Sequence, residues 1–196
     1  MAIRKYIFVF LLYFFSTNVL FSIEPDIFVQ STVNRASKVL SEDISKKEKV
    51  DQLKKIALET VDIKGIGLYT LGTTRKTLND KEKEKYSKVF EEYFLKSFSS
   101  RLAEYTNPEI DVLGKKVLNE NYTIVNSILK GTEERPEVKI DWRIYTKDPN
   151  KPLIRDLIVE GLKLARTQKE EFASILSSND NDINVLFSKL EEFINQ

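Results

Sequence analysis

The stretch from Asn79 to Tyr105 constrains the fold of this chain more than any other segment. Its apolar residues recur at three- and four-residue steps, which places them on one stripe of an α-helix, while Lys and Glu fill the opposite face. No Pro or Gly interrupts it, so the sequence predicts one helix of about 27 residues, roughly 40 Å long. The stripe is either a core seam or, in part, the wall of a pocket for an apolar ligand. It consists of Tyr86, Val89, Phe90, Tyr93, Phe94, Phe98, Leu102 and Tyr105.

The segments before and after this helix differ in their periodicity. Three segments before it have helical spacing, over residues 25–41, 46–60 and 61–72. After it, apolar and polar residues alternate, most clearly from Val138 to Tyr145, and alternation of this kind predicts strands. The predicted strands cover 110–118, 122–129, 138–145 and 153–159, and helices return over 162–176 and 182–193.

Short turns between the four strands favour antiparallel pairing. The sequence therefore predicts an α+β fold in which helices pack around a curved four-stranded antiparallel sheet. The long helix and the sheet each have one apolar face. Packed together these faces form a solid core or, where they splay apart, a cleft.

The N-terminus has the order of charged, apolar and small residues that is typical of a secretory signal peptide. Arg4 and Lys5 precede an apolar run that is too short to span a bilayer, and cleavage is expected near Ser22. We expect a signal peptide over residues 1–22 and a single domain over residues 23–196; an uncleaved anchor is the alternative. Cleavage removes two basic residues and no acidic ones, which changes the formal net charge from +1 to −1. Such a charge gives no general attraction to nucleic acid.

The composition excludes several kinds of active site. The chain contains no Cys and no His, which removes thiol nucleophiles, disulfides, the usual zinc sites and imidazole acid–base chemistry. Gly65 and Gly67 lack the third glycine of a dinucleotide fingerprint, and the run from Asp180 to Asp182 lacks the glycine and closing Glu of a calcium loop. We therefore expect a non-enzymatic binding protein with no catalytic residues, no metal and no cofactor.

Four segments together resemble the MlaC family, also described as the toluene-tolerance or ABC-transporter auxiliary component family. The resemblance covers about Pro25 to Phe193, with departures at Lys163, at Lys169 and in the turn Asn150-Lys151-Pro152. The matching segments are Leu71-Gly72 with Arg75 and the helix ending Ser100-Arg101-Leu102-Ala103-Glu104-Tyr105; Val138-Lys139-Ile140-Asp141-Trp142-Arg143; Leu157-Ile158-Val159-Glu160-Gly161 with Leu162, Leu164, Thr167-Gln168 and Glu171-Phe172; and Asp182 to Leu190.

The resemblance implies a monomeric periplasmic carrier of phospholipid that maintains outer-membrane lipid asymmetry. Its partners would be an outer-membrane lipoprotein–porin complex and an inner-membrane ABC transporter with an MCE-domain subunit. The acyl chains would enter an apolar pocket between the sheet and the helices. We expect that pocket to be lined by Val138, Ile140, Trp142 and Ile144 from the sheet, by Tyr93, Phe94 and Phe98 opposite, by Leu162 and Leu164 near the mouth, and by Tyr69.

Ordinary core packing is the alternative for each of these residues, and solvated charge is the alternative to phosphate contact for Arg143 and Lys163. If Leu162 lines a dry pocket, Leu162→Glu should abolish lipid binding without unfolding the protein. A diacyl lipid has on the order of 30 methylenes, whose exposure to water would cost roughly 25 kcal/mol. Its pocket should then reach the upper end of the usual range of about 300–1,000 Å³.

A different class of protein also fits the sequence. An envelope adaptor or chaperone-like interaction domain would have a solid core, no ligand pocket and an exposed apolar patch as its working surface. A carrier for another apolar molecule on the same fold is a third interpretation.

Overall fold

The computed structural model describes residues 22–133 and 135–196 of the chain. The predicted signal peptide therefore lies outside the described residues, apart from Ser22. Within the described part, no helix combines the length and the apolar character that crossing a membrane requires.

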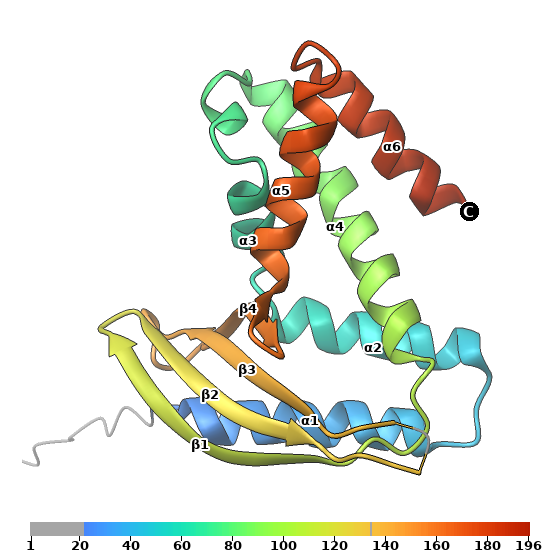
Figure 1. Cartoon of the computed structure of the whole chain (residues 1–196), viewed down its shortest axis with the longest axis vertical. Helices are drawn as coiled ribbons and strands as arrows, with labels where there is room; N and C mark the ends of the chain where they lie inside the picture. The colour runs from blue at the N-terminus through green and yellow to red at the C-terminus, as the bar shows by residue number, and fades with distance from the viewer. Residues whose placement is uncertain (1–21, 134) are drawn as a thin grey trace, which may run out of the picture.

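The described residues form six α-helices, one 3-10 turn and one antiparallel sheet (Figure 1). The chain therefore has the predicted α+β architecture, with helices at both ends of a central run of strands. The elements are α1 (Pro25–Ser41), α2 (Lys46–Thr60), α3 (Ile63–Thr70), η1 (Thr74–Lys76), α4 (Asp80–Leu102), β1 (Ile110–Asn119), β2 (Tyr122–Leu129), β3 (Val138–Tyr145), β4 (Leu153–Val159), β5 (Leu162–Lys163), α5 (Leu164–Ser177) and α6 (Ile183–Asn195).

Local sequence signals set the start of helices α2 and α4. Ser45 accepts a hydrogen bond from the backbone of Glu48, whose carboxylate in turn accepts from the backbone of Ser45. Asn79 and Glu82 form the same reciprocal capping box at the start of α4. These caps satisfy backbone N–H groups that would otherwise have no partner, so both helices begin where the sequence predicts.

The sheet has the strand order β1-β2-β3-β4-β5, and every neighbouring pair is antiparallel. The prediction of four strands was wrong by one. Glu160 and Gly161 both have positive φ, 49° and 82°, and form a tight turn that returns the chain to pair with β4. The pairs are Ile158 with Lys163 and Val159 with Leu162, so α5 begins at Leu164, two residues later than predicted.

The elements form two groups (Figure 1). The sheet lies with α1 and α2, and the N-terminal half of α4 stands above it among α3, α5 and α6. A parallel bridge from Val61 to Ile154 ties the end of α2 to β4. One large apolar cluster runs through both groups, from Val29 and Val125 near the sheet to Phe172 and Leu186 in the helices. Helix α4 is therefore the element common to both groups.

Candidate functional site

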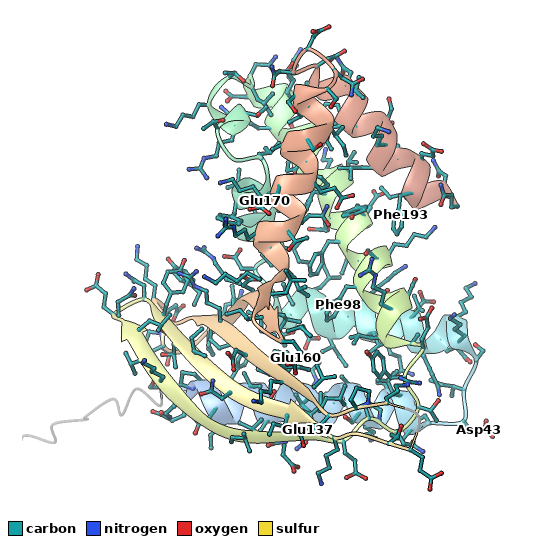
Figure 2. The ribbon with its side chains drawn as sticks, viewed as in Figure 1. Asp43, Phe98, Glu137, Glu160, Glu170 and Phe193 are labelled. Carbon is teal, nitrogen blue, oxygen red and sulfur yellow. The ribbon has the colours of Figure 1, made fainter. Side chains whose placement is uncertain are left out.

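A cavity of about 290 Å³ lies between α4, α5 and the sheet, which we call the first chamber. In Figure 1, α4 and α5 are close together at the top and separate toward the sheet, and Figure 2 shows Phe98 on the part of α4 that faces this space. The wall is mostly aromatic and aliphatic. It includes Ile66, Phe90, Tyr93, Phe94, Ser97, Ala165, Thr167, Gln168 and Glu171.

A second cavity of about 260 Å³, the second chamber, lies among α1, α2, the sheet and the C-terminal end of α4. Its wall is also mostly apolar, because the inward faces of α1 and α2 do not close completely on the sheet. Its lining includes Val33, Ala36, Leu40, Leu53, Ile56, Ala57, Leu102, Tyr105, Val138 and Ile140.

The two chambers adjoin along a common wall. Trp142 is part of this wall, and its indole Nε1 donates a 2.8 Å hydrogen bond to Ser127 Oγ on the neighbouring strand. That bond removes the one polar group of the indole from the cleft. The residues that line both chambers are Val61, Phe98, Arg101, Trp142, Ile154, Leu157 and Leu164.

The volume differs from the sequence-based expectation. Each chamber lies near the lower end of the usual range for ligand pockets, not at its upper end. The physical reason is that large side chains such as Phe94 and Phe98 project into the space between α4 and the sheet, where their rings stack with centroids 5.6 Å apart.

Three polar side chains in the wall of the first chamber are joined by hydrogen bonds. The Tyr93 hydroxyl donates a 2.9 Å hydrogen bond to Gln168 Oε1, and Gln168 Nε2 donates at 2.8 Å to Glu171 Oε2. Burial raises the pKa of the Tyr93 hydroxyl, so this group stays neutral and acts as a donor. These groups satisfy one another, which leaves the neighbouring wall apolar.

Asp156 is the half-buried carboxylate of the first chamber. Its Oδ1 accepts a 2.9 Å hydrogen bond from the backbone N–H of Ala165 and so caps the start of α5 from a neighbouring strand. Burial raises the pKa of Asp156, and this effect outweighs the hydrogen bonds to Ala165 and Leu157 and the charges of Arg143 and Lys163.

Arg101 is the cation in the common wall. Its side chain is exposed, and within the described residues it makes no ion pair and no hydrogen bond. Arg143 and Lys163 do not line either chamber; the Arg143 guanidinium lies 4.4 Å from the ring centroid of Tyr122. The described part of the chain holds no group of three or more acidic side chains arranged to bind a metal ion.

The structure brings seven of the ten predicted site residues into the two chambers. Ile144, in contrast, is fully buried in the core, while Tyr69 is 42% exposed and lies beside Lys169. Leu162 is 57% exposed in β5, outside both linings, so a Glu there would face water and not a dry pocket. The seven residues are Tyr93, Phe94, Phe98, Val138, Ile140, Trp142 and Leu164.

Sequence reasoning missed the contribution of α1, α2 and β4 to the cleft. Val33, Ala36 and Ile56 were recognisable only as part of amphipathic stripes, which indicate burial but not the partner. Leu157 lies on the inward face of β4 through its pairing with Trp142. Arg101 stood in a segment that carries the family resemblance, but nothing in the sequence indicated that its side chain lines the cleft.

Both the sequence and the fold of this chain are similar to those of known proteins. A protein-family model described as "MlaC protein" matches residues 30–192. No curated protein matches the chain. The fold is similar to that of a phospholipid-binding protein from Ralstonia solanacearum solved in complex with a phospholipid, with a TM-score of 0.75 and 19% sequence identity, covering 89% of this chain and 98% of that one.

Proposed function

The chain belongs to the MlaC protein family, and on that premise we propose that it is a periplasmic phospholipid carrier. It takes phospholipid from one membrane complex, covers the acyl chains during transit and delivers the lipid to another. The observation that carries the proposal is the pair of adjoining apolar chambers between the sheet and the helices. The phospholipid in the similar structure from Ralstonia solanacearum supports the same ligand class.

The energetics of lipid tails require a carrier of this kind. Each methylene moved from an apolar environment into water costs about 0.8 kcal/mol, so free diffusion of a diacyl lipid through an aqueous space is negligible. Apolar walls suit acyl chains because a hydrocarbon tail offers no hydrogen bond to a buried polar group. The few polar groups of the first chamber, such as Tyr93 and Gln168, already bond to one another.

The same physics sets how transfer occurs. Because release into water is so costly, the lipid passes in contact with a membrane complex at each end of the route. We propose an outer-membrane lipoprotein–porin complex at one end and an inner-membrane ABC transporter with an MCE-domain subunit at the other. We propose that residues 1–22 are a signal peptide that directs the mature chain, residues 23–196, to the periplasm, and that the mature chain acts there as a monomer.

Native mass spectrometry of residues 23–196, purified without detergent, tests this function. We expect an added mass that disappears on organic extraction and is identified as a phospholipid in the extract. The extracted protein should regain that mass on incubation with phospholipid vesicles. A protein that is free of lipid and remains so after this incubation would contradict the proposal and favour an adaptor without cargo.

The identity of the extracted molecule shows whether the ligand is a phospholipid or another apolar compound. An apolar compound without a phosphate group, bound in place of phospholipid, would keep the carrier mechanism but overturn the ligand. Extraction of a control protein of similar size, prepared from the same cells by the same steps, identifies lipid that adheres to any protein.

A further inference from the structure

We propose that each chamber takes one acyl chain of a two-chain phospholipid and that Arg101, in their common wall, binds the phosphate between the two chains. This inference rests on the proposed function and adds the path of each chain and the residue that recognises the headgroup. It is carried by the volumes of the chambers, by the residues they share and by the charges around them.

The volumes favour one chain in each chamber. A methylene group is close in size to a water molecule, which occupies about 30 Å³ in the liquid. The first chamber, at about 290 Å³, then holds about ten methylenes, and the second, at about 260 Å³, about nine. Neither chamber holds both chains of a common diacyl lipid, which together have on the order of 30 methylenes; each covers about two-thirds of one chain of about 15.

The common wall fits the point at which such a lipid branches. Both acyl chains leave the same glycerol unit, so two separate chambers suit them only if both chambers can be reached from one place. Phe98, Trp142 and Leu164 line both chambers, so the two chambers meet beside these side chains. Leu164 is 41% exposed, so the junction reaches the surface, as a headgroup in contact with water requires.

Charge identifies the phosphate contact. Arg101 is the one charged side chain among the described lining of the second chamber and the one cation in the described lining of the first. The two carboxylates of the first chamber are already engaged, Asp156 by the N–H of Ala165 and Glu171 by Gln168. A phosphodiester is repelled by both carboxylates and attracted by a guanidinium, whose planar donors suit paired phosphate oxygens.

Two matched substitutions test the assignment of the chains. Ser97 lines only the first chamber and Ala36 only the second; both are small, half-buried residues on helices. We expect Ser97→Trp and Ala36→Trp each to weaken binding of dipalmitoyl phosphatidylcholine at least a hundredfold, the loss expected when about four methylenes are no longer buried. Each variant should keep its affinity for one-chain palmitoyl lysophosphatidylcholine, and the double variant should bind neither lipid.

Binding is measured by native mass spectrometry and by titration with each lipid, and thermal unfolding shows whether each variant is folded. Where a variant fails to fold, Thr167→Trp replaces it in the first chamber and Ser37→Trp in the second. If folded variants blocked in either chamber bind the two-chain lipid as the parent does, or if blocking one chamber alone removes both lipids, the assignment is overturned.

Arg101→Gln tests the phosphate contact. The parent protein should prefer dipalmitoyl phosphatidylcholine to dipalmitoylglycerol, which has the same chains and no phosphate, and the variant should lose roughly tenfold or more of that preference. Arg166→Gln is the matched control, because Arg166 pairs with Glu170 on α5 and lines neither chamber. A preference that is unchanged in Arg101→Gln, or reduced equally in Arg166→Gln, overturns the contact. A parent protein that binds no lipid at all contradicts the proposed function instead.

Discussion

The two ends of the aromatic stripe on α4 have different surroundings. Tyr86 and Phe90 are buried, and their rings stack with centroids 5.6 Å apart. Phe94 and Phe98, one and two turns after Phe90, also stack, yet both are only partly buried and both line a chamber, which Phe90 only borders with a ring that is 2% exposed. One continuous pattern therefore becomes solid core at one end and cavity wall at the other.

The difference comes from the neighbours of α4 and not from its own residues. Around Phe90, α3 supplies Gly67 and α5 supplies Phe172, whose ring meets Phe90 edge-on at 6.3 Å. Toward Phe98, α5 has separated from α4, and this end of α4 packs on α2 (Figures 1 and 2). A helix can thus be fixed firmly at one end while the other end lines an open space.

The largest expected effect compares two truncations on this helix. Tyr86→Ala should lower the free energy of unfolding by about 3–5 kcal/mol, because it leaves a void in a filled core. It also removes the 2.8 Å hydrogen bond between the Tyr86 hydroxyl and Thr70 Oγ1. Phe98→Ala should cost only about 1–2 kcal/mol, since its ring already borders a cavity, and should weaken lipid binding. Urea denaturation measures the first effect and lipid titration the second.

Equal losses of stability in the two variants would contradict this distinction. Such a result would mean that the second half of the stripe is packed as tightly as the first. Lipid binding in Tyr86→Ala is the internal control and should be unchanged wherever that variant is folded.

A smaller effect is expected at the helix that packs on Phe90. A Cβ added at Gly67 would lie 2.8 Å from Phe90 Cδ1, closer than two carbon atoms can pack. Gly67→Ala should therefore destabilise the protein by about 1–3 kcal/mol, although Ala favours a helix more than Gly does. Gly114→Ala in β1 is the matched control, because a Cβ there meets nothing within 4 Å. If both glycines tolerate Ala equally, the packing around Phe90 is looser than the structure indicates.

The smallest effect depends on pH. Burial raises the pKa of Asp156 above its ordinary value of 3.8, so folding favours the protonated carboxyl. Stability from this group is present below pH 3.8 and is lost as pH rises through the raised pKa. Asp156→Asn keeps an acceptor for the Ala165 N–H and should be more stable than the parent at neutral pH, with the difference shrinking in acid. Urea midpoints from neutral pH to below pH 3.8 measure it, and a difference that does not change with pH would refute the explanation.

Much of the fold was predictable because local signals agree with one another. The helical spacing that begins at Lys46, the aromatic stripe that begins near Asn79 and the alternation around Trp142 each identified an element at the right place. The fifth strand was missed because it has only two residues, and its leucine fits the start of a helical pattern equally well. Leu162 was expected to be buried for the same reason, and the positive φ of Gly161 shifts it out of the helix.

The site was predictable only in part, because a periodic pattern shows which face is buried and not what it is buried against. Tyr93, Phe94 and Phe98 share a stripe with Tyr86, and nothing in their spacing separates wall from core. Ile144 follows the same alternation as Trp142 but lies in the core, since it pairs with Ile154 beside the Val61 bridge. The role of α1 and α2 depends on tertiary contacts that neither helix encodes alone.

The position of Trp142 has a practical consequence. It is the only tryptophan in the sequence, and its indole ring lies in the wall common to both chambers. The protein thus contains an intrinsic fluorophore at the site itself, without a second indole elsewhere to obscure the signal. Its emission spectrum and its quenching by brominated acyl chains follow occupancy of the cleft in real time, on the native protein and without a label.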